Sequence, residues 1–124
     1  MSDVYAKLKE LGLELPKAPA KGGVYSSSRM FAGNLVYISG CGPVIDGQVA
    51  GKVGKEFTKE EAYVFSRNSM LNVLAVLQDR IGDLNKVKQV VKILVMSSHT
   101  LQTEVPSFWW IYLARKRERL PDLQ

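Results

Sequence analysis

The chain has 124 residues, of which 46% are apolar and 23% charged, with a formal net charge of +5. This length suits a single domain with one hydrophobic core. No run approaches the ~20 apolar residues of a membrane helix, and the first residues lack the apolar stretch of a secretory signal. We therefore expect one cytoplasmic domain over residues 1–124, with no membrane partner.

Metal and cofactor sites are not expected. The chain has one cysteine, Cys41, and one histidine, His99, so neither an internal disulfide nor a zinc-ligand spacing is possible. The basic residues are scattered and fit solvated faces, so we do not expect a nucleic-acid partner.

The first third of the chain reads as a helix, a connection and a hairpin. Residues 3–12 carry apolar side chains at helical spacing and end at Gly12. The prolines and glycines that follow predict an extended connection. Residues 24–31 and 35–39 then read as strands on either side of Gly33-Asn34, a turn dipeptide. A second hairpin turn is predicted at Asp46-Gly47.

The middle of the chain predicts a long helix followed by a strand. Thr58 and Glu61 form a capping box, and the helix should run from Lys59 to Ile81 and end at Gly82. Residues 86–97 become apolar on both faces, which is typical of a strand at the centre of a sheet. The order of elements indicates an α+β fold with helices packed on one face of a sheet.

The end of the second strand, Ser39-Gly40-Cys41-Gly42-Pro43, is the candidate site. It supplies a hydroxyl and bare backbone that could orient a small ligand, and a plain turn is the alternative. A catalytic thiol would need a base, and nothing in the sequence brings His99 to Cys41. Neither of the glycine-rich phosphate-binding motifs is present.

Several segments in order carry a family resemblance: "GVYSSSRMFAGNLVYISGCGP", the helix pattern "A…N-x-L-x-x-L" and "GDLNKVKQVVK". Together they resemble the RidA (YjgF-type) family, from about Tyr5 to Ser98. The resemblance implies a chorismate-mutase-like mixed sheet, a homotrimer with a small-molecule site between subunits, and no cofactor. Residues 1–22 would form an N-terminal extension.

The resemblance implies hydrolysis of reactive enamines and imines, such as 2-aminoacrylate, to 2-keto acids and ammonia. Some members of the family are described as endoribonucleases. The catalytic serine of the family falls on Ser39, Gly40 adds backbone to the pocket, and the tyrosine after glycine falls on Tyr25. Where many members have glutamine this chain has Cys41, so the polar side chain that the resemblance implies at this substrate-binding position is replaced by a thiol.

The C-terminal segment departs from the family. An arginine that pairs with the substrate carboxylate and a late glutamate are expected there, but residues 99–124 contain neither motif. Read one nucleotide later, the codons of Trp109 and Trp110 give Gly-Gly, so we interpret this tail as divergent or frameshifted near residues 105–107. Taken literally, the tail could pack a second helix on the sheet or lie on an anionic membrane.

These observations predict an imine deaminase of the RidA type, impaired in this chain by the missing arginine and glutamate. Two alternatives stay open. One is a ligand-binding trimer without catalysis, and the other is a membrane-surface or RNA-binding protein that acts through residues 108–119.

Overall fold

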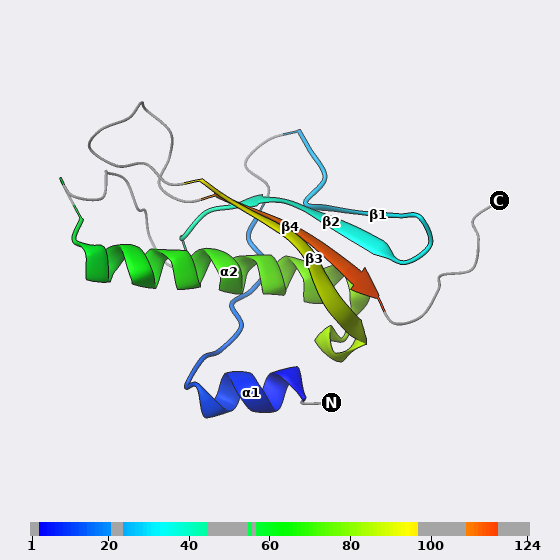
Figure 1. The fold of residues 1–124 in the computed structure, drawn as a ribbon, viewed down its shortest axis with the longest axis horizontal. Helices are drawn as coiled ribbons and strands as arrows, with labels where there is room; N and C mark the ends of the chain where they lie inside the picture. The colour runs from blue at the N-terminus through cyan, green and yellow to red at the C-terminus, as the bar shows by residue number, and fades with distance from the viewer. Residues whose placement is uncertain (1–2, 21–23, 45–54, 56, 97–108, 117–124) are drawn as a thin grey trace.

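The computed structural model describes residues 3–20, 24–44, 55, 57–96 and 109–116. The elements along the chain are α1 (Val4–Glu10), β1 (Ser28–Phe31), β2 (Leu35–Cys41), α2 (Lys59–Ile81), the 3-10 turn η1 (Leu84–Lys86), β3 (Val87–Met96) and β4 (Trp109–Lys116). The predicted α+β class is confirmed (Figure 1). Figure 1 shows both helices on the same side of the sheet.

The four strands lie in the order β1-β2-β4-β3, and each neighbouring pair is antiparallel. β2 and β3 point the same way because α2 crosses between them, but β4 lies between them and runs opposite to both. The mixed sheet that the resemblance implied is therefore not found among the described strands. β3 is an edge strand rather than the predicted central one.

β4 corrects the interpretation of the tail as a second helix. Its backbone pairs with β2 from Leu35↔Arg115 to Cys41↔Trp110, and with β3 from Val87↔Lys116 to Met96↔Trp109. The aromatic and branched run "WWIYL" suits a strand. Between β2 and β3, the backbone of residues 109–116 pairs with a strand on each side. If these residues formed a helix on the face of the sheet, the backbone groups of β2 and β3 that now face β4 would lose these partners.

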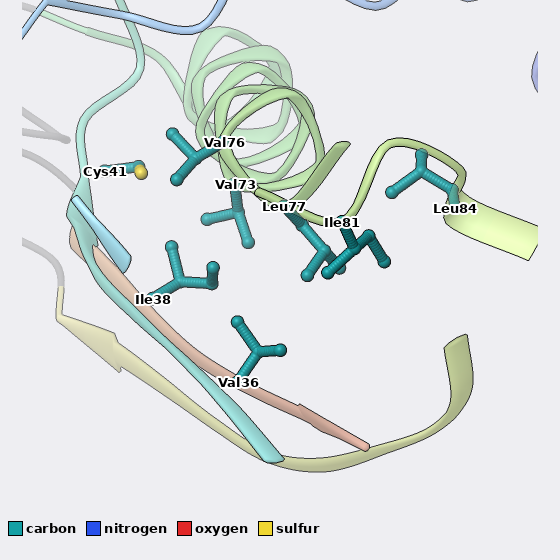
Figure 2. Packing of buried hydrophobic residues seen from close by; sticks show 8 residues of the cluster. All are labelled: Val36, Ile38, Cys41, Val73, Val76, Leu77, Ile81 and Leu84. Carbon is teal, nitrogen blue, oxygen red and sulfur yellow. The ribbon is translucent and has the colours of Figure 1, made fainter. Parts of the chain in front are cut away.

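The core lies between α2 and one face of the sheet. Val36 and Ile38 alternate with the exposed Tyr37 on β2, as expected for a strand with one buried face. Opposite them, α2 contributes Val73, Val76, Leu77 and Ile81, and Leu84 follows from η1 (Figure 2). Val36, Ile38, Val73 and Leu77 are 0% exposed, so the contact between β2 and α2 is fully buried at these residues.

The predicted bounds of α2 are confirmed. The Glu61 amide donates to Thr58 Oγ1 (3.2 Å) while the Thr58 amide donates to the Glu61 carboxylate (2.7 Å). The helix ends at Ile81, and Gly82 follows with φ +83°. The predicted N-terminal helix is also present, although it is shorter and begins at the N-cap Asp3.

The first predicted hairpin is confirmed, with a shorter first strand. β1 begins at Ser28 instead of residue 24, and Ala32 and Gly33 turn the chain with positive φ angles. The second predicted hairpin turn, at Asp46-Gly47, lies outside the described residues, as does His99.

The edge strand β3 has apolar side chains that are exposed in the single chain. Val90, Val91, Ile93, Leu94 and Val95 are each between 41% and 47% exposed. Because they include neighbours in sequence, they point to both faces of the strand. Among the described residues, neither helix has the length and apolar character needed to cross a bilayer.

Candidate functional site

A pocket of about 210 Å³ lies at the end of β2, between this strand, the segment before β1 and the middle of α2. All four predicted site residues line it, namely Tyr25, Ser39, Gly40 and Cys41. The structure thus brings together a tyrosine and a serine that the sequence separates by 14 positions. Their roles with a ligand stay a prediction.

A β-bulge shapes this pocket. Ile38 pairs with Tyr112 and Cys41 with Trp110, so Ser39 and Gly40 stand opposite the single residue Ile111. An extra residue of this kind bends a strand and redirects its side chains. Here it turns Cys41 to the helix-facing side, together with Val36 and Ile38 (Figure 2). Ser39 and Gly40 are the two residues of the bulge itself, and both line the pocket.

The hydroxyl of Ser39 is fixed by the segment that precedes β1. Its Oγ donates to the carbonyl oxygen of Ser26 at 2.6 Å, and the Ser39 amide donates to the carbonyl of Ser27 at 3.0 Å. A serine hydroxyl has one proton and two lone pairs. With the proton directed to Ser26, the oxygen can still accept a hydrogen bond from a ligand N–H or from water.

Cys41 lines the pocket with a buried thiol. Its side chain is 6% exposed, and Sγ lies 3.5 Å from the carbonyl oxygen of Ser39. Burial raises the pKa of the thiol to about 11, because the thiolate would lose its hydration. The group is therefore a neutral thiol at physiological pH, and the reactive species is the thiolate.

Asn72 is a pocket residue that the site prediction missed. It is 2% exposed on α2, and its Nδ2 donates to the carbonyl oxygens of Gly42 (2.9 Å) and Val44 (2.8 Å). An amide within the apolar run of a helix is the signal that could have identified it, because a buried amide needs partners. Ser27 and Val76 also line the pocket and were not predicted.

The lining that the structure describes contains no charged side chain. An arginine that could pair with a carboxylate is thus not found there. Within the described ranges, no group of three or more His, Cys, Asp or Glu side chains is arranged to hold a metal ion. The polar groups of the lining are hydroxyls, one amide and backbone.

A second, more open pocket of about 750 Å³ lies beside α1. Its walls include three leucines, and Lys9, Glu14 and Gln78 are among the polar residues. It contains none of the predicted site residues.

Comparison with solved structures places the fold. A candidate endoribonuclease from Shewanella oneidensis superposes with a TM-score of 0.83 at 18% identity, over 92% of this chain and 99% of that one. Atu1372 from Agrobacterium tumefaciens, a protein of unknown function, gives a TM-score of 0.74 at 21% identity, over 90% of this chain and 92% of that one. These matches fit the RidA-like (YjgF-type) fold.

Sequence comparison identifies one curated relative, whose name indicates no activity. Protein TCP17 from Trypanosoma cruzi is 36% identical over 94 residues, which are 74% of this chain. The chain spans 58% of the length of TCP17. No family model matches the chain. The RidA-like fold thus rests on the two structures, and what the pocket does must be argued from its own residues.

Proposed function

We propose that the chain binds small imino acids and 2-keto acids in the pocket beside Ser39 and slowly hydrolyses the imines. The observation that carries this proposal is the meeting of Tyr25, Ser39 and Gly40 around one pocket in a RidA-like fold. The family resemblance assigned these residues to substrate binding and catalysis. A pocket of about 210 Å³ suits a ligand of a few heavy atoms.

The reaction needs a bound water and no redox partner. Water adds to the imine carbon, the C–N bond of the resulting carbinolamine breaks, and a 2-keto acid and ammonia leave. The lone pairs of Ser39 Oγ accept from the imine N–H or from the attacking water, because its proton is directed to Ser26. The bare backbone of Gly40 lets a planar imine lie close to the strand, and Tyr25 lines the same pocket.

The neutral lining limits the rate in this proposal. A bidentate arginine is the strongest anchor available for a small carboxylate, and the described lining has none. We therefore expect weak binding, with Kd values on the order of millimolar, and slow turnover.

A homotrimer is part of this proposal. The apolar side chains of β3 between Val90 and Val95 are 41% to 47% exposed, which supports contact with further copies of the chain. A mass of about three chains by light scattering is expected, and a monomer at assay concentration would remove this part of the proposal.

The test uses 2-aminoacrylate generated in the assay by an auxiliary enzyme, with ammonia and 2-keto acid measured as products. We expect the chain to accelerate hydrolysis above the buffer rate and Ser39→Ala to remove most of that acceleration. Ser66→Ala is the matched control, because Ser66 lies on α2 outside the pocket lining. A wild-type chain that neither accelerates hydrolysis nor binds a 2-keto acid in ligand-observed NMR would refute the proposal.

The neutral lining also favours a second candidate, a ligand-binding protein without catalysis. It predicts 2-keto acid binding that Ser39→Ala weakens, with no acceleration of imine hydrolysis. RNA cleavage is not proposed for this chain. The Shewanella oneidensis protein is only 18% identical to it, and at that identity the superposition is evidence of a common fold and not of a common activity. Membrane or RNA binding through the tail has no supporting observation, since residues 109–116 form a central strand.

A further inference from the structure

We propose that Asn72 is a positioning residue that fixes one wall of the pocket, the segment from Gly42 to Val44, whose two end residues line the pocket. The effect of Asn72 on catalysis rests on the proposed function, whereas its effect on the position of the wall is independent of that function.

The geometry of the Asn72 amide joins two distant parts of the chain. Both Nδ2 protons are used, on the carbonyl oxygens of Gly42 (2.9 Å) and Val44 (2.8 Å), which lie 30 and 28 positions earlier in the sequence. Because carbonyl oxygens only accept hydrogen bonds, the amino group must face them, and this fixes the orientation of the amide. The side chain is 2% exposed, so water cannot easily replace these bonds.

Packing by the described residues is loose at both ends of the wall. A Cβ added at Gly42 would meet no atom within 4 Å, and Val44 is 39% exposed. Pro43 between them is buried and adds packing, but its nitrogen carries no proton to donate. Asn72, Gly42 and Val44 all line the pocket, and Cys41 lies directly before the wall. A displaced wall would therefore change both the shape of the pocket and access to Cys41.

Cys41 is the only cysteine of the chain, which makes it a specific reporter of this wall. The experiment measures its reaction with 4,4′-dithiodipyridine in the full-length protein under native conditions. Asn72→Ala removes both hydrogen bonds. Asn72→Asp keeps the size of the side chain but directs carboxylate oxygens at two carbonyl oxygens, which is repulsive unless the carboxyl group takes up a proton.

Two controls separate this effect from a general loss of stability. Asn68→Asp adds the same charge one turn earlier on α2, outside the pocket lining. Leu77→Val shortens a fully buried core residue that does not line the pocket, and it gives a comparable or larger fall in melting temperature.

We expect Cys41 to react about tenfold faster or more in both Asn72 variants, the change that corresponds to losing about one to two hydrogen bonds. The two controls should stay within about twofold of wild type. The excess rate of Asn72→Asp over wild type should shrink in mildly acidic buffer, where its carboxyl group can donate to one carbonyl. Equal rates in the Asn72 variants and in Leu77→Val would overturn the proposal.

The imine assay then distinguishes this proposal from the proposed function. If the wild type hydrolyses imines, both Asn72 variants should have a lower kcat/KM at a temperature where they remain folded, while Asn68→Asp should not. If the wild type is inactive and binds no 2-keto acid, the proposed function fails. The Cys41 rates alone then decide whether Asn72 positions the wall.

Discussion

The guanidinium group of Arg80 binds both the side chain and the backbone of Ser28. Its Nε donates to Ser28 Oγ at 2.9 Å, and its Nη2 donates to the Ser28 carbonyl oxygen at 2.7 Å. Ser28 is the first residue of β1 and is 7% exposed. The two bonds join the last turn of α2 to the outer strand of the sheet, next to the serines that hold Ser39.

We predict that Arg80→Met lowers the free energy of unfolding by about 1 to 3 kcal/mol, the range for hydrogen bonds to a charged donor. Arg80→Lys should recover only part of this loss, because an ammonium group cannot reproduce the planar fork. Arg67→Met, at an exposed position of the same helix, is the control. Urea denaturation measures all three, and equal midpoints for Arg80→Met and Arg67→Met would contradict the prediction.

Asn85 attaches α1 to the rest of the molecule. Its Oδ1 accepts from the Val4 amide (2.8 Å) and its Nδ2 donates to Asp3 Oδ1 (2.9 Å). Asn85→Ala should accelerate amide hydrogen exchange in residues 4–11 by about tenfold or more, the equivalent of one or two hydrogen bonds. Exchange in the middle of α2 should change much less. Unchanged exchange in α1, with Asn68→Ala as the comparison, would show that other contacts hold α1, such as the hydrogen bond from the Leu84 amide to the Tyr5 hydroxyl (3.0 Å).

The same contact gives α1 an acid dependence. The side chain of Asn85 first, and the Tyr5 amide next, hold the pKa of Asp3 below its ordinary value. A lowered pKa in the folded state means that the stabilisation is present above the ordinary aspartate pKa and is lost as the pH falls through the folded value. The protection factors of the α1 amides, which compare each exchange rate with its intrinsic value at the same pH, should therefore fall in acid. Asp3→Asn should remove this pH dependence.

Gly82 and Gly42 allow the cost of a positive φ angle to be measured separately from steric crowding, because both have open space for a Cβ and only Gly82 has a positive φ. Gly82 ends α2 with φ +83°, where an L side chain is strained, although a Cβ would meet no atom within 4 Å. Gly82→Ala should cost about 1 kcal/mol or slightly more in unfolding free energy. Gly42 also has open space but no positive φ, so Gly42→Ala should stay within about 0.5 kcal/mol of wild type. Similar losses in the two variants would show that φ is not the cause.

Burial of Cys41 predicts a stability change in alkaline solution. The pKa of its thiol is raised to about 11 in the folded protein, so above the ordinary cysteine pKa the unfolded chain binds fewer protons than the folded one. The contribution of Cys41 is therefore complete below the ordinary pKa and is lost progressively as the pH rises toward 11. The unfolding free energy of wild type minus that of Cys41→Ala should decrease from about pH 8 to pH 10. A constant difference would indicate a thiol with an ordinary pKa.

Local signals in the sequence predicted the helices well. The capping box of Thr58 and Glu61 and the stop at Gly82 act within one turn of the helix, so the bounds of α2 follow from neighbouring residues. The hairpin around Gly33 follows in the same way from its turn residues. For the site, the resemblance identified Tyr25, Ser39, Gly40 and Cys41, which line one pocket, but their contribution to binding awaits the experiments above.

The order of the strands could not be predicted from such signals. The apolar run of β3 suggested a central strand, yet β4 occupies the place between β2 and β3, and the apolar side chains of β3 remain exposed. Pairing between strands depends on which distant backbone groups meet, and the pattern of one segment does not contain that information.

The sequence by itself determined where α2 and the first hairpin form, because caps, turns and periodicity are properties of adjacent residues. Only the tertiary structure decided that residues 109–116 join the sheet, that the bulge turns Cys41 inward, and that Asn72 meets the carbonyl groups of Gly42 and Val44. These outcomes depend on contacts between residues 13 to 80 positions apart, from Met96↔Trp109 to Leu35↔Arg115. The chain makes them only when burial of the core between α2 and the sheet brings those residues together.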